Sequence, residues 1–295
     1  MKKIRTYLLF TFISAWLIGI IGCHDLKNAG TGGMISFSYS LSLCMYMPAL
    51  GAFFAGAGIS KMGWRLNLEK NYKLILFAWL IPTALQIAGA VLYFGIFPDD
   101  LDISGEILKE RSPELYAKLE ENGTSYTSYV AKEVFYSITS FYTFLAVFQG
   151  LGEEIGWRGF LFQELKKICG RTKGVLIGGV IHGIWHFPLM LLIGYEYGTD
   201  YIGAPVLGLF AFCLFTVTTG IISDHLYEKT KSIWLPAIIH GTTNATFDVY
   251  MLGGDEHRTI FGPANVGIIS MIPLAALAGW ILYKNYITEP IDEYE

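Results

Sequence analysis

Long apolar segments recur along almost the whole chain, separated by polar ones, and this pattern most restricts the possible fold. Of the 295 residues, 53% are hydrophobic and 16% are charged, and the mean hydropathy is +0.44. Soluble domains carry about 25% charged residues. Because a backbone in lipid must satisfy its hydrogen bonds internally, apolar segments of this length predict membrane-spanning helices. We therefore expect an all-α, polytopic transmembrane helical bundle that forms a single domain over residues 1–295.

The hydropathy pattern predicts about eight spans. The basic start and apolar run that end at Cys23 favour a retained first span over a secretory signal, although Ile-Ile-Gly before Cys23 resembles a lipoprotein cleavage site. The other spans are expected at about 37–59, 74–97, 134–151, 175–193, 202–223, 233–252 and 266–286. The long polar segment 98–133 includes ILKERSPELYAKLEEN, which suits a short amphipathic helix over the site or a solvated loop.

Basic residues concentrate in alternate loops and orient the predicted spans. They precede span one and follow spans two, four and six, at Lys2, Lys3, Arg5, Lys61, Arg65, Lys70, Lys73, Lys166, Lys167, Arg171, Lys173, Lys229 and Lys231. This alternation predicts that both termini are cytoplasmic. No basic stripe is present, so nucleic acid is not an expected partner, and membrane lipid is. The four scattered cysteines show no metal or disulfide spacing.

Three polar clusters interrupt the apolar spans, where acids and histidines are costly and therefore mark candidate functional sites. The first is GEEIGWR, with Glu153, Glu154 and Arg158; the other two are HGIWH, with His182 and His186, and HGTTN, with His240 and Asn244. At 1.5 Å per residue, the two histidine clusters lie at overlapping depths, roughly 10 to 20 Å from the same side. A single buried site is therefore expected.

Helical spacing suggests a role for each group. Glu154 and Arg158 are four residues apart in the favourable acid-first order, so they are expected to pair and leave Glu153 for chemistry. A glutamate and a histidine that share a water suit general-base hydrolysis, and Asn244 with one histidine suits oxyanion stabilisation. Asp248, one turn beyond Asn244, is expected only to pair helices.

A metal is an equally open alternative. Glu153, His186 and His240 could ligate a catalytic Zn²⁺ with a water in the fourth position, although the chain has no HExxH motif. Each polar group could also serve only as a structural contact between helices. A non-proteolytic carrier or adaptor with a buried Glu/His core is therefore the competing class. The sequence shows neither an inverted repeat nor paired broken helices, and this argues against a carrier.

The three clusters resemble the motifs of a known family. GEEIGWR resembles the EExxxR motif of the CAAX prenyl protease and bacteriocin-processing (Abi, CPBP) family of intramembrane glutamate-type endopeptidases; IHGIWHFP resembles its FxxxH motif and HGTTN its HxxxN motif. The resemblance covers roughly residues 130–250. It implies a helical bundle with a cytosol-facing polar cavity and a hydrolytic enzyme. Its catalytic residues would be Glu153, His186, His240 and Asn244, supported by Glu154 and Arg158.

One position departs from the family pattern. His182 stands where the second motif has phenylalanine, and it could act as an extra ligand, tune His186 or fill space. The implied substrate is a lipid-modified or membrane-associated peptide, and the implied location is a membrane, expected to be the plasma membrane of a bacterium.

Overall fold

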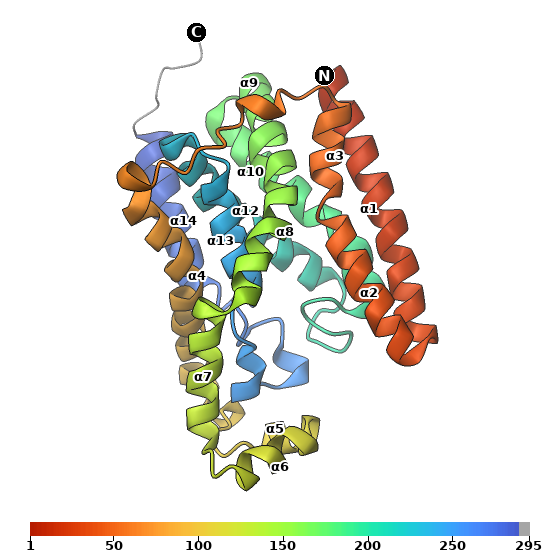
Figure 1. Ribbon diagram of the computed structural model, residues 1–295, viewed down its shortest axis with the longest axis vertical. Coiled ribbons are helices and arrows are strands. Elements are labelled where there is room, and N and C mark those ends of the chain that lie inside the picture. The colour runs from red at the N-terminus through yellow and green to blue at the C-terminus, as the bar shows by residue number, and fades with distance from the viewer. Residues whose placement is uncertain (289–295) are drawn as a thin grey trace.

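The protein is a bundle of long helices (Figure 1). The computed structural model describes residues 1–288. In it, α1 (Lys2–Asn28) packs against α2 (Gly30–Cys44) and α3 (Met47–Phe54), and α4 (Leu68–Ile96) follows. The bundle is completed by α7 (Tyr126–Thr139), α8 (Phe141–Gly156), α9 (Phe162–Cys169), α10 (Arg171–Trp185), α11 (Phe187–Ile193), α12 (Val206–Thr230), α13 (Trp234–Asn244) and α14 (Ile272–Leu282).

The prediction of a helical membrane bundle is confirmed, whereas the count of eight spans is not. Five helical segments are long and apolar enough to cross a membrane, namely 2–28, 30–54, 68–96, 171–193 and 206–230. The pair 126–139 and 141–169, bent by 46°, can make a sixth. The last two predicted spans contain shorter helices: α13 ends at Asn244 rather than near 252, and α14 begins at Ile272. The expected cytoplasmic C-terminus lies outside the described residues.

The polar segment after α4 contains more helix than a solvated loop would. Residues 106–121 form two short helices, α5 (Glu106–Arg111) and α6 (Pro113–Glu121), at the end of the bundle that lies farthest from the N-terminus (Figure 1). Loop contacts hold this end together: Asp102 N donates to Leu252 O at 2.8 Å, and Ile202 N donates to His257 O at 3.0 Å. We call this end, formed by residues 24–34, 97–133, 194–205 and 245–271, the distal face.

The opposite end carries the N-terminus, and we call it the proximal face (residues 1–5, 55–73, 164–173, 224–234 and 283–288). A buried ionic network ties it together, since Lys166 Nζ lies 2.6 Å from Asp224 and 2.8 Å from Glu228. The Tyr286 hydroxyl donates to Asp224 at 2.7 Å, and Ile233 N donates to Gly63 O at 3.0 Å. The ends of α9, α12 and the C-terminal π-turn (Tyr283–Ile287) are thereby fixed to one another.

Small residues allow α8 and α13 to approach closely. A Cβ on Gly241 would lie 2.4 Å from Val147 N, and a Cβ on Gly150 would lie 3.1 Å from Gly241 N. Only hydrogen fits at this crossing. The contact brings His240 on α13 directly against the glutamate pair on α8.

Candidate functional site

The first polar cluster lies where α8 ends. The helix continues beyond Glu154 through a π-helical turn (Trp157–Leu161) before α9 begins. Such turns are rare and often occur at functional sites. Here the turn places the Trp157 indole and the Arg158 guanidinium on the same side of the chain as the two carboxylates.

Glu154 is the centre of a buried ion cluster. Its Oε1 accepts a hydrogen bond from Arg158 Nη1 at 2.7 Å and lies 2.7 Å from His240 Nδ1. The side chains of Glu154 and Arg158 are 0% and 1% exposed. The predicted pairing of Glu154 with Arg158 is therefore present. This pairing fixes the Glu154 carboxylate, which in turn holds His240 in one orientation.

Glu153 uses one carboxylate oxygen for hydrogen bonding. Its Oε2 accepts from Trp157 Nε1 at 3.0 Å and lies 3.0 Å from His182 Nε2. Within residues 1–288, Oε1 has no comparably short contact, and the nearest imidazole nitrogen is His240 Nε2 at 3.7 Å. Glu153 is thus oriented through one oxygen while the other faces the interior of the bundle.

His186 occupies the break between α10 and α11. Its Nδ1 lies 3.1 Å from the His182 carbonyl oxygen. Because a carbonyl can only accept, Nδ1 carries the proton and Nε2 of the neutral ring is an acceptor. The ring packs edge-on against Phe212, with centroids 4.8 Å apart. The sequence did not indicate that His182, rather than His186, would contact Glu153, since these residues lie 29 positions apart.

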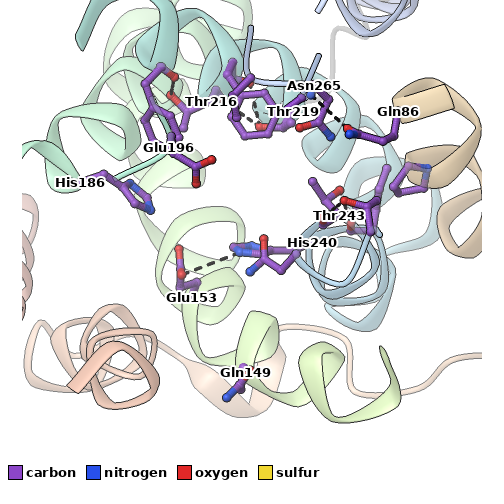
Figure 2. Close-up of a pocket in the computed structure, with 18 of the residues that line it drawn as sticks. Gln86, Gln149, Glu153, His186, Glu196, Thr216, Thr219, His240, Thr243 and Asn265 are labelled. Carbon is purple, nitrogen blue, oxygen red and sulfur yellow. Dashed lines mark hydrogen bonds and ion pairs between the residues drawn. The ribbon is translucent and has the colours of Figure 1, made fainter. Parts of the chain in front are cut away.

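These groups line one cavity of about 640 Å³ (Figure 2). Glu153 and His240 face each other on one side, His186 and Glu196 lie on an adjacent wall, and Thr216, Thr219, Gln86 and Asn265 close the remaining walls (Figure 2). Asn244, the last residue of α13, also lines the cavity. All seven residues predicted to form the site therefore border the same space.

Two acids in the cavity were not predicted as site residues. Glu196 lies in the loop after α11 with a φ of 75°, a left-handed conformation that is uncommon outside glycine. Asp248, expected only to pair helices, is exposed and borders the cavity one turn beyond Asn244. The short loop sequence GYEYGTD gave no signal that Glu196 would turn inwards.

The expected zinc ligands do not form a metal-binding set. Across the described part of the chain, no three His, Cys, Asp or Glu side chains are arranged to hold a metal ion together. Glu153 contacts His182 and His240 rather than His186, and both histidines already face carboxylates. The residues present do not fit the predicted Glu153, His186 and His240 set, and no chemical step below passes through a metal.

The fold and the site define the chain as a multi-pass helical membrane protein that buries a cluster of two glutamates, an arginine and three histidines beside a polar cavity. Residues 135–246 match the family model described as type II CAAX prenyl endopeptidase Rce1-like. This confirms the resemblance inferred from the motifs: over the segment that holds every candidate catalytic residue, the chain is related to the type II CAAX prenyl endopeptidases.

Two curated relatives are similar over parts of the chain. CAAX prenyl protease 2 of Methanococcus maripaludis is 28% identical over 113 residues, which are 38% of this chain and 41% of that protein. The Na(+)/H(+) antiporter NhaA of Haemophilus ducreyi is 32% identical over 95 residues, 30% of this chain and 24% of that protein. The matches therefore span less than half of either relative. The family match and the CAAX prenyl protease 2 match together support a CAAX-protease-like function.

Proposed function

We propose that the protein is a membrane-embedded endopeptidase that hydrolyses a membrane-associated peptide by direct attack of water. The observation that carries this proposal is the position of the Glu153 carboxylate and the contacts of its two oxygens. Its carboxylate is 3% exposed and oriented through Oε2, while Oε1 is available towards a cavity lined by His186, His240 and Asn244. A positioned carboxylate beside an imidazole is a suitable general base.

Each group has a distinct role in the proposed reaction. Glu153 takes a proton from a water as its oxygen bonds to the scissile carbonyl carbon, and neutral His186 accepts the water's other hydrogen bond through Nε2. The carbonyl π electrons move to oxygen, and the Asn244 amide and protonated His240 donate to the oxyanion. Glu153 then passes its proton to the amide nitrogen as the C–N bond breaks, which leaves a carboxylic acid and an amine.

Glu154, Arg158 and His182 are positioning residues in this scheme. Glu154 and Arg158 hold His240, and His182 and Trp157 hold Glu153. None of these residues needs to touch the substrate. The substrate itself is proposed by analogy to the relatives: a lipid-modified or otherwise membrane-associated peptide.

Cleavage of a fluorogenic peptide by the purified protein in detergent tests the proposal. Wild type, Glu153→Gln and His186→Ala are compared, each with and without a chelator. Glu164→Gln is the matched control, because Glu164 pairs with Lys167 on the proximal face, away from the cavity. We expect both site variants to lose cleavage by about 10²–10⁴-fold and the control to retain it. Full activity in folded Glu153→Gln protein would refute the mechanism.

A carrier is the second candidate, favoured by the antiporter match. The α2–α3 segment breaks at Met45–Tyr46 and the α10–α11 segment at His186. Both segments nevertheless count as single spans, 30–54 and 171–193, so the expectation of no paired broken helices, which are typical of transporter sites, is not overturned. Sodium-dependent proton flux in proteoliposomes, lost in Glu153→Gln, would favour the carrier over the endopeptidase.

A further inference from the structure

The proposed reaction leaves one carboxylate of the cavity without a role. Glu196 lies in the loop between α11 and α12, is half-buried, and points its carboxylate into the cavity from the wall that also carries His186 (Figure 2). Within residues 1–288, every ion pair of a lysine or arginine is made with a different acid. A carboxylate removed from water is costly unless a positive group lies beside it. Glu196 is therefore suited to binding a cation.

The charges of the cavity lining point the same way. Apart from its histidines, the lining contains four acids and one base, and none of its described residues is a lysine. The base, Arg158, is paired with Glu154. Asp248 is exposed, and its carboxylate already caps the turn that follows it. Because Glu153 is the base of the proposed reaction, Glu196 is the acid of the cavity interior that a substrate cation can pair with.

Tyrosine side chains surround the Glu196 carboxylate. The Tyr195 hydroxyl donates a hydrogen bond to it. Its negative charge raises the pKa of Tyr195, and burial followed by the same charge raises the pKa of Tyr197 and Tyr250. The faces of aromatic rings attract lysine and arginine side chains, so tyrosines beside a carboxylate favour a cation further.

Tyr250 adds an independent sign of a ligand. Its side chain lines the cavity, and its hydroxyl oxygen is buried without a hydrogen-bond partner among residues 1–288. A buried hydroxyl that makes no hydrogen bond costs about 1–3 kcal/mol. An ammonium or guanidinium group beside Glu196 could donate to this oxygen as well as to the carboxylate.

The catalytic groups share this small space with Glu196. The Tyr195 ring is nearly parallel to that of His186, with centroids 6.5 Å apart and an interplanar angle of 11°. The Glu196 carboxylate faces the same part of the cavity as Glu153 and His240 (Figure 2). The cavity volume of about 640 Å³ is typical of a small-molecule site, so only a short stretch of peptide fits in it. A side chain that reaches Glu196 must therefore lie close to the bond that is cleaved.

We propose that Glu196 binds a lysine or arginine side chain of the substrate, so that the protein selects peptides with a basic residue close to the scissile bond. Tyr195 orients the carboxylate, and Tyr250 contributes its ring and its hydroxyl. The proposal rests on the endopeptidase function for the reaction and narrows its substrate class. A cation bound at this position also favours the ionised form of Glu196.

Matched peptides test this specificity. The fluorogenic peptide is made with lysine, glutamine or glutamate at one position, this position is moved along an otherwise neutral sequence, and mass spectrometry of the products locates the cleaved bond. We expect wild type to cleave the best lysine peptide with a kcat/KM about 10–100-fold above that of its glutamine counterpart, the range for a charge-assisted hydrogen bond. Most of the difference should lie in KM, because the charge is bound before and during the reaction.

Variants of Glu196 assign the preference to this residue. In Glu196→Gln the ratio of lysine to glutamine peptide should fall to near one. In Glu196→Lys the preference should move to the glutamate peptide, an effect that a merely structural role of Glu196 would not produce. Asp200→Asn is the matched control and should keep the wild-type ratio, because Asp200 is exposed in the same loop and lies outside the cavity lining. A ratio near one in wild type, or an unchanged preference in folded Glu196→Gln protein, would overturn the proposal.

Peptide binding separates this proposal from the endopeptidase function. Fluorescence anisotropy of dye-labelled lysine and glutamine peptides gives the Kd of each without any cleavage. If wild type cleaves neither peptide but binds the lysine peptide about 10–100-fold more tightly, and Glu196→Gln abolishes the difference, the endopeptidase function fails and the cation site stands. If wild type cleaves both peptides and binds them equally, the cation site fails and the endopeptidase function stands.

Discussion

Removal of the Arg158 charge should destabilise the protein strongly, because the buried Glu154 carboxylate loses its arginine partner and keeps the contact with His240 Nδ1. Arg158 and Glu154 are 1% and 0% exposed and are 2.7 Å apart. An exposed ion pair contributes about 0–1 kcal/mol, whereas loss of one partner of a buried pair costs about 3–5 kcal/mol. Because both side chains are buried, the larger of these two magnitudes applies to the Arg158–Glu154 pair. We expect Arg158→Met, which keeps much of the side-chain volume, to lower the free energy of unfolding by about 3–5 kcal/mol.

The double variant Arg158→Met/Glu154→Gln separates stability from function. With both charges gone, neither member of the buried Arg158–Glu154 pair is left without its partner, so most of the lost stability should return. Peptide cleavage should stay low, because His240 has lost the carboxylate that holds its Nδ1. Denaturant unfolding in mixed micelles measures the first effect, and kcat measures the second. A loss below about 1 kcal/mol in Arg158→Met, or a double variant no more stable than the single one, would show that this ion pair does not stabilise the fold.

Three further predictions concern the packing of α8 against α13, His182 at the position where the family motif has phenylalanine, and the cavity acid Glu196. Gly241→Ala should cost about 1–3 kcal/mol and lower activity by displacing α13 from α8, whereas Gly279→Ala, with no atom within 4 Å of its new Cβ, should change neither. His182→Phe should retain kcat within about tenfold, because a phenyl ring fills the space against Trp157. His186→Ala should lower kcat by at least about a hundredfold, because His186 faces the cavity. Burial raises the pKa of Glu196 to about 7, although a hydrogen bond from Tyr195 opposes the shift; His186, Tyr195, Tyr197 and Tyr250 are the titratable groups around it. As the pH rises through 7, Glu196 gains charge, so KM for a lysine-rich peptide should fall, and Glu196→Gln should flatten this change. The unfolded carboxyl ionises near its ordinary pKa of 4.5, so folding stability should fall as the pH rises from about 4.5 to 7 and change little above that.

Local patterns predicted much of the site. The four-residue spacing of Glu154 and Arg158 predicted their ion pair, and the helical continuation through Arg158 is present. The two histidine clusters were expected at overlapping depths, and together with the glutamate cluster they line one cavity. These predictions succeeded because helix periodicity and the cost of polar groups in lipid act on neighbouring residues.

Contacts between distant segments could not be predicted in the same way. The contact of His182 with Glu153 depends on how α10 crosses α8, which is set by many small packing choices. Glu196 faces the cavity because its backbone adopts a left-handed conformation, for which glutamate has no sequence signature. The predicted seventh span was too long because the apolar residues after Asn244 pack as a folded loop rather than continuing the helix.

The central claim is that Glu153 activates the attacking water. The most direct test is the kcat of Glu153→Gln protein with wild-type unfolding behaviour, measured on a peptide that wild type cleaves. The amide keeps the shape and can still accept from Trp157, but it cannot take a proton. We expect kcat to fall by at least about a hundredfold. A kcat within about tenfold of wild type would contradict it.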